Sequence, residues 1–262
     1  MSKTGVIAGS GMYEIEGLKI KSKKKIKTPY GDPSAAYVTG MIGNKDVIFL
    51  PRHGDHHNIP PHMINYRANI WGFKKLGVDR ILSISAVGCI KKGLKPGDIV
   101  ITDQVLDMTR NRVSTFYDGK EGVVHIDFTE PYCDELRKLV IKAAKKQKVP
   151  IKKGGTYVAV DGPRLESAAE IKGFAILGGD IVGMTGMPEA SLAREAELCF
   201  SGISVVANYA AGISKTKLTV TEVMEEMKGA TAMLKSLLAE TLSSMPDARK
   251  CVCGESLKEA TI

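Results

Sequence analysis

The chain has 262 residues, of which 44% are hydrophobic and 25% are charged, and this composition is typical of a globular protein with a sizeable core. No apolar run approaches the ~20 residues of a membrane span and the N-terminus lacks a signal-peptide pattern, so we expect a cytoplasmic protein without membrane contact. The net charge of +8 comes from separate lysine-rich stretches without interleaved aromatic residues, which argues against nucleic-acid binding.

Apolar and amphipathic segments alternate along the chain, and this alternation predicts an α/β fold with a largely parallel sheet. Strands are expected at residues 6–8, 35–41, 47–50, 80–86, 98–102, 157–160, 180–182 and 204–207, the second and third joined by a turn at Gly43-Asn44. Helices are expected at 65–76, 131–148, 166–177, from Pro188 onward, and at 219–243 behind a capping box of Thr219 and Glu222. Because no linker or repeat is visible, we expect one domain over residues 1–245 and a tail over 246–262.

Polar or glycine-rich segments recur where the expected strands end. These segments are residues 9–11, 52–57, 85–88, 162–166, 183–187 and 208–210. Ligands of open α/β sheets bind at the carboxyl ends of the strands, so the six segments are expected to form one site. Gly9-Ser10-Gly11 suits a phosphate, although it lacks the third glycine of a dinucleotide fingerprint.

Four of the five histidines lie within ten residues, at His53, His56, His57 and His62. This segment has three interpretations: a metal site, an anion site or a solvated loop. The histidine spacing would suit metal ligands on a helix, but Pro60-Pro61 prevents a helix there. Arg52 and His53 together offer a planar fork and an imidazole, which favours phosphate.

Several motifs, taken together and in chain order, resemble the trimeric purine nucleoside phosphorylases and, among them, the 5′-methylthioadenosine phosphorylase branch. The motifs are Gly9-Ser10-Gly11, Arg52-His53-Gly54, Asn65-Tyr66-Arg67-Ala68-Asn69, Ser85-Ala86-Val87-Gly88, Pro96-Gly97-Asp98, Phe116-Tyr117-Asp118, Gly162-Pro163-Arg164, Met184-Thr185-Gly186-Met187-Pro188-Glu189 and Leu192-Ala193-Arg194-Glu195-Ala196. The resemblance covers residues 4 to about 240. It implies a single-domain nucleoside phosphorylase fold with a mixed, largely parallel, barrel-like central sheet flanked by helices.

The resemblance also implies a reaction, phosphorolysis of a purine nucleoside to a free base and a sugar 1-phosphate. Phosphate, the co-substrate, would be bound by Ser10, Arg52, His53, Ser85, Ala86 and Thr185. Met184 would lie against the ribose, Leu165 and Ala210 would line the substrate pocket, and His125 would reach the 5′ end of a neighbouring subunit's substrate. No metal or organic cofactor is implied, and the expected assembly is a homotrimer, with a hexamer of two trimers left open.

Two positions depart from the methylthioadenosine branch and concern the purine base. Asn208 stands where that branch has the first Asp of an Asp-Tyr-Asp segment, and an amide can donate to a 6-oxo group while a carboxylate only accepts. Glu166 replaces a small residue and can accept from N1–H, which 6-oxopurines carry and adenine lacks. Asn208 and Glu166 are therefore predicted to select and stabilise a 6-oxopurine leaving group.

The 5′ end of the substrate is predicted to meet an apolar wall. Inosine and guanosine phosphorylases carry a histidine where this chain has Val220, and Val223 and Met224 follow one helical turn later. Such a wall suits a methylthio group, although the same spacing is also the ordinary pattern of a core-facing helix. The preferred substrate is thus predicted to be 5′-methylthioinosine, with inosine or guanosine, and then 5′-methylthioadenosine, as alternatives. A metallohydrolase built on the histidines and a basic nucleic-acid-binding protein are the alternatives from other classes.

The chain contains five cysteines. Cys89 lies in an apolar stretch and is expected to be a buried thiol. Cys251 and Cys253 form a CxC pair that cannot by itself complete a tetrahedral zinc site. Disulfides between Cys133 and Cys199, and between Cys251 and Cys253, remain open from sequence.

Overall fold

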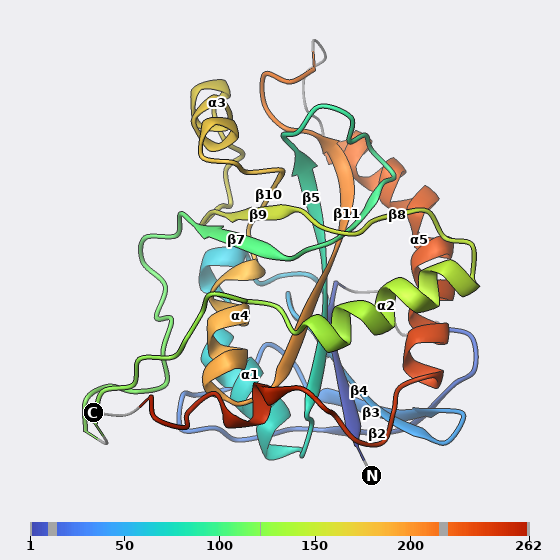
Figure 1. The fold of residues 1–262 in the computed structure, drawn as a ribbon, viewed down its shortest axis with the longest axis vertical. Coiled ribbons are helices and arrows are strands. Elements are labelled where there is room, and N and C mark those ends of the chain that lie inside the picture. Colours follow the sequence, from blue (N-terminus) through green and yellow to red (C-terminus); the bar gives the residue numbers. More distant parts are fainter. Residues whose placement is uncertain (1, 10–14, 121, 215–219, 261–262) are drawn as a thin grey trace.

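The structure is a computed structural model that describes residues 2–9, 15–120, 122–214 and 220–260, with the backbone alone at residues 220 and 222–229. These residues form eleven strands and five α-helices (Figure 1). The strands are β1 (Lys3–Ala8), β2 (Leu18–Lys24), β3 (Tyr37–Ile42), β4 (Lys45–Pro51), β5 (Arg80–Cys89), β6 (Ile99–Ile101), β7 (Gln104–Asp107), β8 (Ile151–Lys152), β9 (Thr156–Ala159), β10 (Ile181–Gly183) and β11 (Cys199–Tyr209). The helices are α1 (Tyr66–Lys75), α2 (Asp134–Lys146), α3 (Ala168–Ile176), α4 (Gly186–Glu195) and α5 (Val220–Ser243), with short 3-10 turns η1 (Pro61–Met63) and η2 (Val252–Glu255).

All the strands belong to one mixed sheet. Its main path runs β2-β3-β4-β1-β5-β10-β9-β7, while β11 pairs with both β5 and β6, and β6 pairs with β8. Six of the ten strand pairings are parallel, which confirms the expected mixed and largely parallel sheet. The sheet does not close into a barrel, because the path ends at the unpaired outer edges of β2 and β7.

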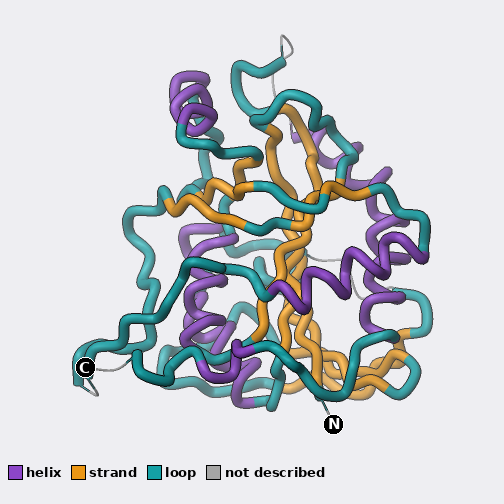
Figure 2. The backbone as a smooth tube through the Cα atoms, in the orientation of Figure 1, coloured by secondary structure: helices purple, strands orange, loops and turns teal. Residues whose placement is uncertain are grey.

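Helices cover both faces of the central strands. Along β5, Leu82 and Ile84 pack into one apolar cluster while Ile81 packs into another, as expected for side chains that alternate across a strand. The first cluster includes residues of α2 and α5, and the second includes residues of α1 and α4. Figures 1 and 2 show these helix pairs on either side of β5 and β11, with α3 projecting at one end of the molecule.

Most predicted elements are present, and the hairpin at Gly43-Asn44 is confirmed by the antiparallel pairing of β3 and β4. The predicted strands did not include β2, whose lysines indicated only solvated faces, or the short strands β7 and β8. The strand β2 lies at the edge of the sheet and is exposed along most of its length, so charged residues are tolerated there. The expected capping box at residues 219–222 lies outside the residues with described side chains.

Pro188 was predicted to lie in a regular first helical turn, and this prediction is wrong. The Met187–Pro188 peptide is cis, and both residues have non-helical backbone angles, so regular helical geometry in α4 begins after Pro188. Among the described residues, no helix is both long and apolar enough to cross a membrane.

Two mid-helix glycines offer a matched test of this packing. A Cβ on Gly72 in α1 would come within 2.6 Å of Cζ of the buried Tyr37 ring, whose hydroxyl donates to the Asn69 carbonyl at 2.7 Å. A Cβ on Gly173 in α3 would meet nothing within 4 Å. We expect Gly173→Ala to stabilise the protein by up to about 1 kcal/mol and Gly72→Ala to destabilise it by about 1–3 kcal/mol in urea unfolding. Equal effects would contradict the close α1–β3 packing.

Candidate active site

The ends of β1, β4 and β5 lie together because these strands are parallel neighbours. Ala8 pairs with Pro51 at the end of the β1–β4 ladder, and the Arg52 amide then donates to the Ala8 carbonyl at 3.0 Å. The ends of β1 and β4 therefore lie side by side, as the sequence predicted. Ser10, the residue expected to bind phosphate after β1, lies outside the described residues.

A buried ion pair fixes Arg52. Its Nε and Nη2 donate to the two carboxylate oxygens of Glu189 at 2.5 and 3.0 Å, and both side chains are at most 2% exposed. Nη2 also donates to Ser83 Oγ at 2.7 Å, and that hydroxyl donates to Glu189 at 2.7 Å. Nη1 donates to the Ile84 carbonyl at 2.8 Å. These contacts use four of the five guanidinium N–H groups and leave one on Nη1 for a ligand.

The electrostatics of this pair favour a permanently charged arginine. Burial alone would lower the pKa of Arg52, but the charge and hydrogen bonds of Glu189 outweigh it, so the pKa is raised. Glu189 is the partner that the sequence analysis missed. The two residues are 137 positions apart, and the only sequence signal was Glu189 at the end of the Met184–Glu189 motif.

His53 is held as a neutral ring beside Arg52. Its Nδ1 lies 2.9 Å from the Ile59 carbonyl, which only accepts, so Nδ1 carries the proton and Nε2 is left as an acceptor. Burial and then the charge of Arg52 lower the pKa of His53 to about 4. His56 and His62 are exposed, and the four histidines of this segment do not gather into a metal-binding group.

The central strand β5 is exposed to solvent at the two residues where phosphate is expected. Every residue of β5 is buried except the half-exposed Ser85 and the exposed Ala86. Ser85 Oγ lies 3.2 Å from Ser204 Oγ of the neighbouring β11. Because Ile84 binds Arg52 through its carbonyl, this accessible stretch begins directly beside the arginine.

Met184 and Thr185 directly follow β10, which pairs antiparallel with the end of β5 through Val182 and Gly88. The amide of Thr185, at the N-terminus of α4, donates to the Tyr157 hydroxyl at 3.2 Å, and the threonine hydroxyl makes no capping bond to the helix. The Met184 side chain packs against Gly162, where a Cβ would collide with its sulfur. Gly162 has a positive φ of 65°, so glycine suits both the backbone and the contact.

The two residues predicted to recognise the base come from segments that touch. Asn208 lies at a register shift near the end of β11, and its Nδ2 donates to the Tyr209 carbonyl at 2.7 Å. The chain after β11 packs on the start of α3, since Ala210 shares an apolar cluster with Ile171, and a Cβ on Gly212 would lie 2.7 Å from Ala168.

Glu166 lies just before α3, half-buried, and burial raises its pKa. Leu165 beside it is 50% exposed, while Ala210 is buried. The structure thus places Glu166 on the loop that leads into the helix packed against the Asn208 segment.

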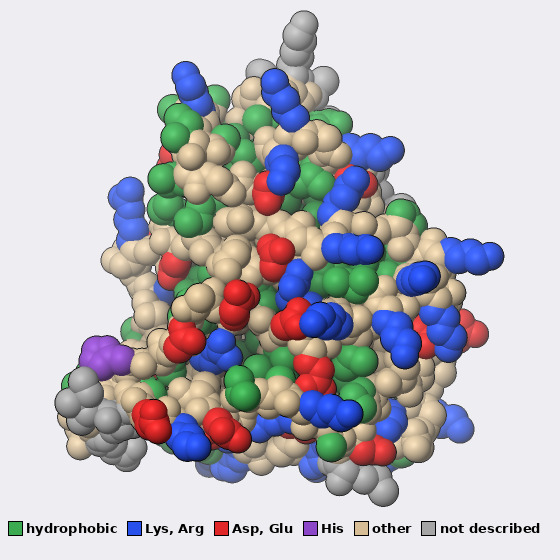
Figure 3. Space-filling model, viewed as in Figure 1, with side chains coloured by type: hydrophobic (Ala, Val, Ile, Leu, Met, Phe, Trp, Pro, Cys, Tyr) green, Lys and Arg blue, Asp and Glu red, His purple; other side chains and the backbone are tan. Residues whose placement is uncertain are grey.

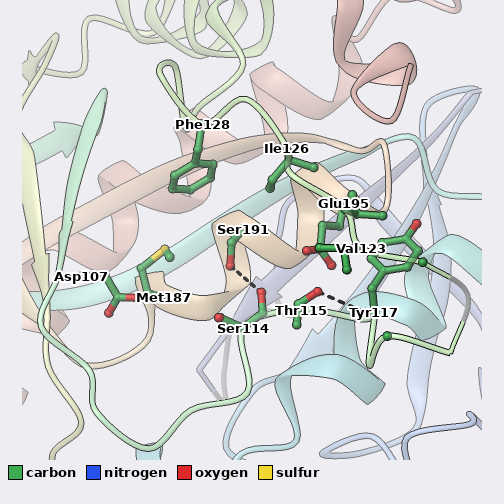
Figure 4. A pocket seen from close by; sticks show the side chains of 13 residues that line it. Asp107, Ser114, Thr115, Tyr117, Val123, Ile126, Phe128, Met187, Ser191 and Glu195 are labelled. Carbon is green, nitrogen blue, oxygen red and sulfur yellow. Dashed lines mark hydrogen bonds between the residues drawn. The ribbon is translucent and has the colours of Figure 1, made fainter. Parts of the chain in front are cut away.

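Other predicted residues are not brought to this edge. The His125 amide donates to the Ala260 carbonyl at 2.8 Å, so His125 lies beside the C-terminal tail. The side chains of Val220, Val223 and Met224 lie outside the described residues. A cavity of about 390 Å³ lies along another face of α4, lined by Met187, Ser191 and Glu195 (Figure 4). Its other walls come from Asp107 at the end of β7 and from residues 114–119 and 122–128. The Ser191 hydroxyl donates to the Ser114 carbonyl at 3.2 Å.

The surface charge does not form one continuous basic patch on the face drawn in Figure 3, where lysines and arginines alternate with acidic side chains.

Comparison with known proteins identifies the family. A family model described as the phosphorylase superfamily matches residues 3–243. The chain belongs to the phosphorylase superfamily. It is 50% identical over 260 residues to a probable S-methyl-5′-thioinosine phosphorylase of Thermodesulfovibrio yellowstonii, covering 99% of this chain and 97% of that one. It is 48% identical over 267 residues to the 6-oxopurine nucleoside phosphorylase of Pyrococcus furiosus, with all of both chains covered.

A solved structure gives the same result for the fold. Methylthioadenosine phosphorylase from Schistosoma mansoni in complex with adenine superposes with a TM-score of 0.93 at 32% identity, over 100% of this chain and 98% of that one. The expected nucleoside phosphorylase fold is thereby confirmed.

The buried ion pair predicts a large stability effect. Glu189→Gln would leave the Arg52 charge buried without a counter-charge, so we expect the free energy of unfolding to fall by about 3–5 kcal/mol in urea. As a control, Lys138→Met removes the exposed pair with Asp134 in α2 and should change stability little. A Glu189→Gln variant as stable as the wild type would show that this carboxylate does not balance Arg52.

The neutral state of His53 predicts a pH dependence. Because its pKa is lowered from 6.5 to about 4 in the folded state, its contribution to stability is complete above pH 6.5 and is lost as the pH falls toward 4. The stability difference between the wild type and His53→Asn should therefore shrink over this interval. Thermal unfolding between pH 4 and 7 measures it, and parallel profiles for the two proteins would be inconsistent with a neutral, buried imidazole.

Proposed function

We propose that this protein is a purine nucleoside phosphorylase, a pentosyltransferase of purine salvage. Its preferred substrate is 5′-methylthioinosine, and its products are hypoxanthine and 5-methylthioribose 1-phosphate. The observation that carries this proposal is the accessible Ser85-Ala86 stretch in the otherwise buried β5, bordered by Arg52. An accessible stretch beside a fixed cation, at the carboxyl ends of parallel strands, is suited to an anionic co-substrate.

Phosphate is bound by hydrogen-bond donors, of which only Arg52 is charged, and Glu189 already balances that charge. The remaining Nη1 N–H of Arg52, the hydroxyls of Ser85 and Thr185, and the Ala86 backbone surround the phosphate. The neutral His53 accepts, through Nε2, the hydroxyl hydrogen that phosphate carries near neutral pH. Ser10 completes the set as a prediction from the sequence.

The reaction needs no nucleophile from the protein. A phosphate oxygen attacks C1′ of the sugar as the bond from C1′ to N9 breaks, through a transition state with oxocarbenium character. The electron pair of the broken bond leaves with the purine. The phosphate gives up its hydroxyl proton as its oxygen bonds to C1′, and the purine takes up one proton at N7, so that protons and charge balance. The protein accelerates this step by fixing phosphate under the sugar and by stabilising the departing base. Met184 supplies the apolar contact for the ribose.

The base is distinguished by its donors and acceptors. The Asn208 amide donates to O6 of hypoxanthine and accepts from a protonated N7, and the ionised Glu166 carboxylate accepts from N1–H. Adenine offers an amino group in place of O6 and has no N1–H, so it leaves polar groups of the pocket unpaired. The names of the relatives from Thermodesulfovibrio and Pyrococcus support this choice, and the Schistosoma structure keeps 5′-methylthioadenosine as an alternative after inosine and guanosine.

The proposal extends to the location and the subunit assembly of the enzyme. The protein works in the cytoplasm as a homotrimer in which His125 reaches a neighbouring subunit's substrate, and a hexamer of two trimers is an extension of that assembly. The place of His125 beside the tail, away from the strand ends, supports a contact between subunits. The apolar 5′ wall, at Val220, Val223 and Met224, is a prediction from the sequence. Phosphate is the co-substrate, and the reaction uses no organic cofactor.

Substrate preference tests the assigned roles. The catalytic efficiency should be highest for 5′-methylthioinosine, lower for inosine and guanosine, and lowest for 5′-methylthioadenosine, in initial-rate assays with phosphate. Asn208→Asp combined with Glu166→Ser should change the substrate preference. The ratio of the catalytic efficiency for 5′-methylthioinosine to that for 5′-methylthioadenosine should fall by at least about tenfold.

Glu170→Gln is a suitable control, because the Glu170 carboxylate is engaged by Arg164 and by the Ser167 amide in the capping box of α3. This variant should leave the ratio unchanged. Fastest cleavage of 5′-methylthioadenosine by the wild type, or no shift in the double variant, would refute the roles given to Asn208 and Glu166.

A further inference from the structure

Four cysteines that are distant in the sequence meet at one point. Cys133 precedes α2 as its N-cap, Cys199 begins β11, and Cys251 and Cys253 flank the start of η2 in the tail. All four Sγ atoms lie within 4.8 Å of one another, and all are free thiols in the structure. Three of these side chains are buried and Cys251 is half-buried. The fold thus adds two ligands to a CxC pair that could not complete a metal site alone.

We propose that these four cysteines form a structural zinc site. Zinc in closed structural sites takes four thiolates at about 2.3 Å, which places the sulfurs about 3.8 Å apart at the corners of a tetrahedron. A set of four sulfurs in which each is near the other three matches this requirement, and Cys199 and Cys251 are 3.3 Å apart. Binding displaces the four thiol protons as Zn²⁺ takes their place.

The surroundings match the charge of such a centre. Zn²⁺ with four thiolates carries two net negative charges, and two arginines lie beside the cluster. Arg194 Nη1 is 3.9 Å from Cys253 Sγ, and its buried Nε has no hydrogen-bond partner. Arg249 donates to the Glu197 carbonyl at 2.7 Å, two residues before Cys199, and packs on Gly254. Two neutral disulfides made from the same sulfurs would need neither cation.

Backbone donors complete the environment. The Leu136 amide donates to Cys133 Sγ at 3.4 Å, the kind of N–H to sulfur bond that orients and stabilises a metal-bound thiolate. The site would join α2, β11 and the tail at one point. The tail is otherwise attached by polar contacts, such as the Ser256 hydroxyl to the Arg194 carbonyl and Lys45 to Asp247. The zinc would therefore fasten residues 246–262 to the sheet.

Metal content and thiol titration test the proposal on the whole protein, purified under nitrogen from zinc-supplemented cells. We expect about one zinc per chain by elemental analysis. Titration with a mercurial reagent should release zinc as four thiols react, and metal removal should lower Tm by at least about 5 °C. Cobalt should replace zinc and give thiolate-to-metal charge-transfer absorption.

The variant Cys251→Ser changes the most accessible ligand and should lose most of the bound zinc. Cys89→Ser is the matched control, because Cys89 is a buried thiol outside the cluster and its loss should leave the zinc content unchanged. If serine variants fold poorly, the wild-type measurements decide alone. Two disulfides in the anaerobically purified wild type, with only one thiol reactive after denaturation, would overturn the proposal. Five reactive thiols without bound metal would do the same.

Discussion

The buried pair of Arg52 and Glu189 is the interaction on which the site depends. A charge removed from water is tolerated only when it is paired and hydrogen-bonded, and here both carboxylate oxygens and four guanidinium N–H groups are used. The pair joins the end of β4 to the start of α4, and through Ser83 and Ile84 it also holds β5. Three elements from distant parts of the chain are thereby fixed around one point.

This arrangement explains how a cation can remain ready for a ligand in the interior. Glu189 balances the charge of Arg52, so the guanidinium can remain buried without bound phosphate as a counter-ion. His53 stays neutral because it is buried next to that cation, and the Ile59 carbonyl fixes which ring nitrogen carries the proton. The site is therefore preorganised, and binding energy is not spent on assembling it.

The sequence could predict what depends on local pattern. Alternating apolar segments identified the α/β class and most strands, because a buried strand and an amphipathic helix differ in their periodicity. The strand ends predicted the position of the site, because parallel strands finish at one edge. Charged residues concealed β2, since an edge strand does not need an apolar pattern.

Pairings between distant segments could not be predicted in the same way. Nothing in the sequence linked Arg52 to Glu189, although a buried arginine requires some carboxylate. The meeting of the four cysteines was hidden for the same reason, because it depends on the path of the tail across the start of β11. The contact between the Asn208 and Glu166 segments likewise follows only from the packing of α3 on the end of β11.

We propose that phosphate, and not water, cleaves a 6-oxopurine nucleoside at this site. Phosphorus NMR of the enzyme with 5′-methylthioinosine and inorganic phosphate tests it most directly. We expect the phosphate signal to decline as a sugar 1-phosphate signal appears in an amount equal to the hypoxanthine released. Release of hypoxanthine at the same rate without phosphate, or with the phosphate signal unchanged, would contradict it.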